Sequence, residues 1–181
     1  MKLMIASDLH GSFIWTKKLI DKFHEENCDN LLLLGDLLYH GPRNALPNEY
    51  DTMETAKLLN SIKDKIMAVR GNCDSEVDEM VLEFDIKERN MMLYIDGVNL
   101  FATHGHIYNE DYLPAFQQFD VLLNGHTHTT LFNKHKDYVF VNPGSTSIPK
   151  NGTKHSCAIY DNRVFSFYDL ENGELIRKES I

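Results

Sequence analysis

The fold is decided by one short stretch, Leu31-Leu32-Leu33-Leu34-Gly35-Asp36, in a chain of 181 residues. Four consecutive leucines cannot alternate between a buried and an exposed face. A strand over residues 31–34 must therefore be covered on both sides, as in a layered α/β fold. Glycine and aspartate then end the run, because both favour turns. The stretch predicts a buried strand that presents a carboxylate at its carboxyl end.

Further apolar runs of strand length lie along the chain, each bounded by Gly, Asn, Asp or Pro. They are Leu3–Ala6, Ile66–Val69, Leu100–Thr103, Val121–Leu123 and Val139–Val141, with Cys157–Asp161, Val164–Asp169 and Glu174–Glu179 nearer the C-terminus. The element order is β-α-β-α-β followed mostly by strands. This order predicts a single domain over residues 1–181, built as a sandwich of sheets with helices outside.

Two amphipathic segments predict the helices that separate the first strands. The first repeats an apolar residue at every fourth position, and the second does so at every third position after a predicted N-cap at Asp51. The expected buried positions are Trp15, Leu19 and Phe23 in the first helix and Met53, Ala56, Leu59 and Ile62 in the second.

Composition narrows the class of protein. Apolar residues make up 43% and charged residues 25%, which is ordinary for a globular chain. The formal charge of -9 disfavours general binding of nucleic acid. No apolar run approaches the roughly 18 residues that span a bilayer, and the N-terminus resembles no signal peptide. Cys28, Cys73 and Cys157 lack metal-site spacing. We therefore expect a cytoplasmic protein with no membrane partner.

Six of the predicted strands are followed by short turns rich in His, Asp, Asn and Gly, where α/β proteins gather their ligands. The candidate ligands in these turns are Asp8, His10, Asp36, Asn72, His104, His126 and His128. Asp8/His10 and His126/His128 are each separated by two residues, so on extended backbone each pair would face one ion. These donors suit Mn, Fe or Zn. Seven ligands exceed the need of one ion, whereas two ions about 3.5–4 Å apart would use them all.

The motifs Asp-x-His, Gly-Asp, Gly-Asn, His-Gly-His and Gly-His-x-His, in this order, resemble the calcineurin-like metallophosphoesterase superfamily over residues 3–148. Segments 40–47, 69–78 and 142–145 are similar to its small bacterial YfcE-type phosphodiesterases. The resemblance implies a four-layer αββα sandwich of two mixed sheets flanked by helices. It also implies two ions, usually manganese, and hydrolysis of small phosphodiesters.

The resemblance also assigns ligands to the two ions, with one carboxylate shared. It implies that Asp8, His10, Asp36 and His128 hold one ion, and that Asp36, Asn72, His104 and His126 hold the other. The nucleophile would be a hydroxide between the ions. Many relatives carry an Asp–His dyad for the leaving group, but Tyr39, His40 and Cys73 stand at those places here. The YfcE type shares the Gly-Asn-Cys-Asp form that contains Cys73.

Two further residues are candidates for catalysis. Arg43 is expected to contact a phosphate oxygen, with a surface ion pair as the alternative. His106 is expected to orient the substrate or protonate the leaving oxygen, with support of His104 as the alternative. Cys73 is expected to be a packing residue, since no activating base accompanies it.

Other functions remain open at this level. A phosphomonoesterase or a nucleotide pyrophosphohydrolase could use the same residues, and a non-catalytic scaffold could use the same fold. The complete ligand set favours catalysis. The expected partner is a small phosphodiester substrate, and a homo-oligomer is compatible with the sequence.

Overall fold

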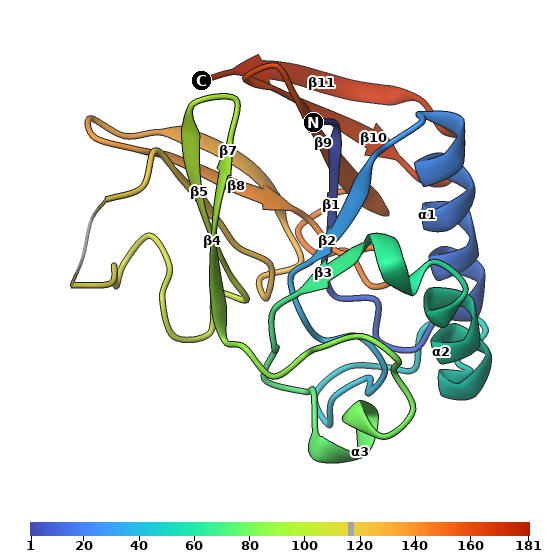
Figure 1. Ribbon diagram of the computed structural model, residues 1–181. Helices are drawn as coiled ribbons and strands as arrows, with labels where there is room; N and C mark the ends of the chain where they lie inside the picture. The colour runs from blue at the N-terminus through green and yellow to red at the C-terminus, as the bar shows by residue number, and fades with distance from the viewer. Residues whose placement is uncertain (116–117) are drawn as a thin grey trace.

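Two mixed β-sheets pack face to face in the computed structural model, which describes residues 1–115 and 118–181 (Figure 1). The first sheet has the order β11-β10-β9-β1-β2-β3, in which β1, β2 and β3 are parallel. Its strands are β1 (Leu3–Ala6), β2 (Asn30–Leu33), β3 (Ile66–Ala68), β9 (Ser156–Asp161), β10 (Val164–Asp169) and β11 (Leu175–Ser180).

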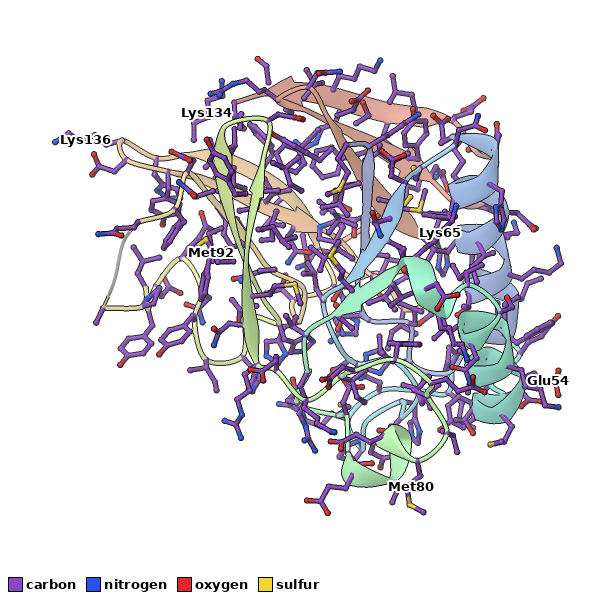
Figure 2. All side chains as sticks on the ribbon, in the orientation of Figure 1. Glu54, Lys65, Met80, Met92, Lys134 and Lys136 are labelled. Atoms are coloured by element: carbon purple, nitrogen blue, oxygen red, sulfur yellow. The ribbon has the colours of Figure 1, made fainter. Side chains whose placement is uncertain are left out.

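The second sheet has the order β4-β5-β6-β8-β7, in which β5, β6 and β8 are parallel and the two edge strands run antiparallel to them. Its strands are β4 (Asn90–Ile95), β5 (Val98–Thr103), β6 (Val121–Leu123), β7 (Thr130–Lys134) and β8 (Val139–Pro143). The expectation of two mixed sheets is confirmed. Side chains fill the space between the sheets (Figure 2).

The leucine run lies between two cores, as its composition predicts. Leu31 and Leu33 belong to the core beneath the helices, whereas Leu32 and Leu34 belong to the core between the sheets. All four side chains are fully buried. Because neighbouring side chains on a strand point to opposite faces, one apolar run contributes to both cores.

Helices α1 (Phe13–Glu25) and α2 (Thr52–Asn60) cover the outer face of the first sheet (Figure 1). The predicted N-cap is confirmed, since Asp51 accepts a hydrogen bond of 3.0 Å from the Glu54 N–H. The assignment of Met53 to the buried face is wrong, because this side chain is 52% exposed. A strict spacing of three drifts off the 3.6-residue turn, so Thr55 faces the core together with the predicted residues Ala56 and Leu59. A short helix, α3 (Glu76–Glu79), and a 3₁₀ turn, Lys63–Lys65, complete the helical elements of the described residues.

The outer face of the second sheet is covered by a loop. Phe101, Leu122 and Phe140 point away from the other sheet and pack with Phe119 and Tyr108. Segment 105–115 contains no helix, so in the described chain the main helical layer lies on the first sheet. No helix of the described residues is long and apolar enough to cross a membrane.

Candidate metal centre

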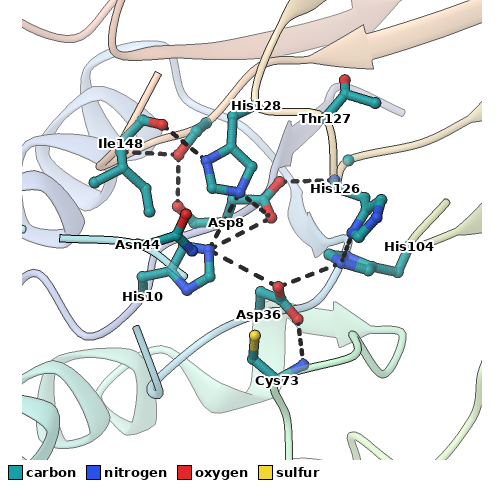
Figure 3. A network of polar contacts seen from close by, with 12 residues as sticks. Asp8, His10, Asp36, Asn44, Cys73, His104, His126, Thr127, His128 and Ile148 are labelled. Atoms are coloured by element: carbon teal, nitrogen blue, oxygen red, sulfur yellow. Dashed lines mark hydrogen bonds and ion pairs between the residues drawn. The ribbon is translucent and has the colours of Figure 1, made fainter. Parts of the chain in front are cut away.

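The seven predicted ligands come together where the parallel strands of both sheets end. Figure 3 labels six of them, all but Asn72. One group contains Asp8, His10 and His128: Nε2 of His128 lies 3.3 Å from Asp8 Oδ1, and Nε2 of His10 lies 3.7 Å from the same oxygen. Apart from the Asn72 and His126 side chains, the ligands are buried. Residues up to 120 positions apart in the chain therefore meet in one cluster.

The second group surrounds His104. Its Nε2 lies 3.1 Å from Asn72 Oδ1, 3.3 Å from His126 Nδ1 and 3.4 Å from Asp36 Oδ2. Asp36 Oδ2 also lies 3.8 Å from His10 Nε2, in the first group. Asp36 is therefore placed between the two groups.

Three of the histidines have fixed ring orientations because one nitrogen faces a backbone carbonyl. Nδ1 of His10, His104 and His128 lies 2.7, 2.7 and 2.8 Å from the carbonyl oxygens of Tyr39, Leu34 and Ile148, respectively. A carbonyl only accepts, so Nδ1 carries the proton. In the neutral ring Nε2 then presents its lone pair to the cluster, as in histidines that bind a metal.

This arrangement fits bound cations. His10 Nε2 and His128 Nε2 lie 3.4 Å apart, and two neutral rings of this tautomer would set lone pair against lone pair. Asp8 Oδ1 is buried and has no hydrogen-bond partner in the described chain. A buried acceptor without a partner costs free energy, and a cation coordinated by these atoms would remove that cost. The nitrogen and oxygen donors suit a first-row divalent ion.

Charge within the cluster follows from burial and from short contacts. Burial alone would raise the pKa of Asp8, but His10 and His128 hold it well below its usual value. Burial would lower the pKa of His104, yet Asp36 and Asp8 raise it to about 9. Burial and the charge of His104 lower the pKa of His126 to about 4. Without metal, a positive charge on His104 therefore offsets part of the charge of the two carboxylates.

Five of the ligands have left-handed backbone, which residues other than glycine rarely adopt. They are Asp8, His10, Asp36, His126 and His128, with φ between 47° and 64°. The expectation that each i, i+2 pair projects from extended backbone is thus wrong. Asp8 and His10 still converge, but His126 contacts His104 whereas His128 contacts Asp8.

Buried polar groups hold this strained backbone. Asp74 Oδ2 accepts hydrogen bonds from the N–H groups of Asp36 (2.9 Å) and Gly71 (2.7 Å), and its Oδ1 accepts one from Leu37 N–H (2.8 Å). The carbonyl oxygen of Asp8 accepts hydrogen bonds from the hydroxyls of two serines in the loop after β8. These contacts fix the two carboxylates before any ligand binds.

A cleft of about 400 Å³ opens onto the cluster and is lined by Asp36, Asn72 and His126. Arg43, the predicted phosphate contact, lines the same cleft. Lys150 also lines it and was not singled out from the sequence, since an isolated lysine in a loop gives no pattern.

The structure places His106 beside the cluster, with its ring 5.4 Å from that of His104. Its Nδ1 is buried without a hydrogen-bond partner in the described residues. Cys73 donates its backbone N–H to Asp36 Oδ1 at 2.8 Å, and burial raises the pKa of its thiol to about 12. A thiol in this state is no nucleophile near neutral pH, which agrees with the packing role expected for it.

Comparison with known proteins places this architecture in a family. The family model of the calcineurin-like phosphoesterase superfamily domain matches residues 1–163. The phosphodiesterase YfcE of Escherichia coli (strain K12) is 44% identical over 181 residues, covering 100% of this chain and 98% of that protein. The phosphodiesterase MJ0936 of Methanocaldococcus jannaschii is 28% identical over 166 residues, covering 84% of this chain and 91% of that protein.

Solved structures agree with this placement. The Escherichia coli phosphoesterase Yfce superposes with a TM-score of 0.95 at 43% identity, over 100% of both chains. Vps29 of Chaetomium thermophilum superposes with a TM-score of 0.66 at 20% identity, over 100% of this chain and 97% of the other, which shows a shared fold alone. The chain belongs to the calcineurin-like phosphoesterase superfamily.

Proposed function

We propose that this protein is a phosphodiesterase that hydrolyses small phosphodiesters with two divalent cations held by the seven clustered side chains. Full-length identity of 44% to the phosphodiesterase YfcE supports the reaction class, hydrolysis of phosphoric ester bonds. Two observations support the metal centre. Imidazole nitrogens and carboxylate oxygens converge on one point, with His10 Nε2 and His128 Nε2 3.4 Å apart, and the buried Asp8 Oδ1 has no hydrogen-bond partner in the described chain.

Each ion would be held by one of the two groups of ligands, and Asp36 would belong to both because its Oδ2 faces both groups. Asp8, His10 and His128 complete the first set, and Asn72, His104 and His126 complete the second. The two carboxylates offset half of the charge of two divalent ions. The floor of the cleft is then cationic in a chain of net charge -9, which favours a phosphoryl group there.

When bound, two divalent cations would activate a water molecule for attack on phosphorus and neutralise charge on the phosphate oxygens. The protein holds the side chains that would bind the ions in position. Asp74 holds the backbone of Asp36 through three backbone N–H groups, and the carbonyl contacts of the histidines fix their rings. Arg43 binds the substrate from the wall of the cleft.

Departure of the leaving group receives little help from the chain. Tyr39, His40 and Cys73 occupy the places where many relatives carry a dyad, and the Cys73 thiol stays protonated. His106 supports His104 or contacts the leaving oxygen, since its ring lies against that of His104. Esters with good leaving groups, such as aryl esters, should therefore react fastest.

Manganese is the proposed native ion, with iron or zinc as alternatives that the same nitrogen and oxygen donors accept. The proposed setting is the cytoplasm, where the three free cysteines would stay reduced. One domain over residues 1–181 accounts for the two packed sheets.

A substrate panel across metals tests the proposal. The protein is stripped with a chelator and reloaded with Mn²⁺, Fe²⁺ or Zn²⁺. It is then assayed on bis(4-nitrophenyl) phosphate, 4-nitrophenyl phosphate and a nucleoside triphosphate. We expect metal-dependent hydrolysis of the diester above the other two. Full activity after thorough chelation would contradict the metal centre, and preference for the monoester or the anhydride would favour the alternative reactions.

A further inference from the structure

The cleft over the metal centre carries two cations besides the proposed metal ligands. Arg43 and Lys150 both line it, and the only acidic side chain in its lining is Asp36, a proposed ligand. Neither cation forms an ion pair within the part of the chain that the structure describes. Lys154 on the same loop, in contrast, pairs with Asp169 at 3.6 Å, and Arg70 pairs with Glu79 at 3.1 Å. Unpaired cations in an acidic protein point to an anionic ligand.

The two cations reach the cleft from separate loops whose backbones are anchored. Lys150 N–H donates to the carbonyl of the proposed ligand His128 at 2.9 Å, and its own carbonyl accepts hydrogen bonds from Thr153. Arg43 lies in a turn closed by a hydrogen bond of 2.8 Å from Asn44 Nδ2 to the His40 carbonyl. Both side chains therefore start from fixed points beside the metal centre.

A second pocket, which shares Asn72 with this cleft, has a different charge pattern. It has a volume of about 440 Å³, and its lining mixes Arg70 and Arg89 with Asp74 and Glu76. A phosphodiester bound at the centre has two ester groups, or arms, one on each side of the phosphorus atom. Apart from the proposed ligand Asp36, the charged side chains of the first cleft are cations, whereas the second pocket has mixed charge.

We infer that Arg43 and Lys150 form a subsite for a second anionic group of the substrate, so that the preferred phosphodiesters carry an ionised carboxylate or phosphoryl group on one arm. This inference rests on the proposed phosphodiesterase function. The cleft of about 400 Å³ lies within the size range of small-molecule sites and leaves room for more than the reacting phosphate.

A matched pair of esters tests the subsite. The first ester is 4-carboxyphenyl 4-nitrophenyl phosphate. In the second the carboxylate is methylated, which keeps nearly the same shape and removes the additional charge. A third ester with a phosphonate on the ring separates a preference for carboxylate from one for a phosphoryl group. The measured quantity is the ratio of kcat/KM for each anionic ester to that for the neutral ester, with the manganese-loaded protein.

We expect Lys150→Met to lower this ratio about threefold to fivefold. This is the contribution that one partly exposed charge pair usually makes to binding. Adding Arg43→Met should lower it about tenfold or more. Lys150→Arg should keep the ratio, because it keeps the charge. The control is Lys154→Met, which removes a lysine of the same loop outside the cleft and should leave the ratio unchanged.

The outcomes separate the inference from the function on which it rests. Absence of metal-dependent turnover on any diester would contradict the phosphodiesterase itself. Turnover with equal ratios in the wild type and in Lys150→Met would overturn the subsite alone. An equal loss of preference in Lys154→Met would also overturn it, because the effect would then come from the overall charge of the protein.

Discussion

Replacing Gly71 with alanine should displace the carboxylate that both proposed ions share. Gly71 follows β3 and its φ lies outside the left-handed region, so alanine imposes no backbone strain there. A methyl carbon at this position would stand 2.9 Å from Asp36 Cγ and closer still to Asp36 Oδ1. The substitution is therefore a purely steric probe of the position of Asp36.

The size of the effect follows from the closest contacts, which are Asp36 Oδ1 and the Asp36 backbone nitrogen, both nearer to the new methyl carbon than Cγ. Because such contacts are essentially never shorter than 3.0 Å, Asp36 must move by roughly 1 Å. Catalytic groups must stay within about 0.5 Å of their productive positions, and a displacement of about 1 Å can cost about 100-fold in rate. We expect Gly71→Ala to lower kcat/KM by about 100-fold. Overpacking should also lower the free energy of unfolding by about 1–3 kcal/mol.

Hydrolysis of bis(4-nitrophenyl) phosphate by the manganese-loaded protein measures the rate, and elemental analysis measures the ions held per chain. The control is Gly97→Ala, in the β4–β5 turn, where φ is 77° and the nearest atom to the new methyl lies 4.0 Å away. It should cost about 1–2 kcal/mol of stability from left-handed strain and leave the rate unchanged. A Gly71→Ala protein that holds two ions and keeps more than a third of the rate would refute the reasoning.

Three other outcomes follow from the same geometry. Asp74→Asn should leave a buried N–H without an acceptor and lower the free energy of unfolding by about 1–3 kcal/mol, measured by urea denaturation of the metal-free protein; an unchanged midpoint would contradict the bracing role. Because the pKa of His104 is raised to about 9, metal binding at pH 7 should release about one proton per chain. This release should vanish above pH 9, and calorimetry in buffers of different ionisation enthalpy measures it; no release at pH 7 would show that His104 is neutral or not a ligand. Cys73→Ser should keep activity within about threefold, since a thiol with a pKa of about 12 is no nucleophile, and complete loss in a folded, metal-loaded variant would point to a thiol mechanism.

The strands that the sequence predicted best are those buried on both faces. The bounds of β1 (Leu3–Ala6) and β6 (Val121–Leu123) agree with the predicted runs, and every residue of both strands is buried. The edge strands β4 and β7 were not predicted. Each pairs on one side only, and β4 alternates exposed and half-buried residues up to Ile95. Edge positions tolerate polar and mixed residues, so their apolar pattern is weak.

The ligand types and their order were predictable, but the conformation that brings them together was not. Left-handed backbone at Asp8 is fixed from a distance, because its carbonyl accepts hydrogen bonds from the hydroxyls of Ser145 and Ser147. The place of Lys150 in the cleft likewise depends on its hydrogen bond to His128. Such contacts join segments that share no local pattern, so only the folded chain shows them.

The arrangement of the ligands costs the folded protein free energy even when no metal is bound. Left-handed backbone costs roughly 1–2 kcal/mol at a residue other than glycine, and five of the ligands adopt it. Two neutral rings at His10 and His128 would also set their Nε2 lone pairs against each other across 3.4 Å. Cations relieve the repulsion between donors but not the backbone strain, which Asp74 and the serine hydroxyls must hold. The position of the metal ligands relative to the substrate therefore depends on residues that contact neither metal nor substrate, because these residues keep the ligands in place.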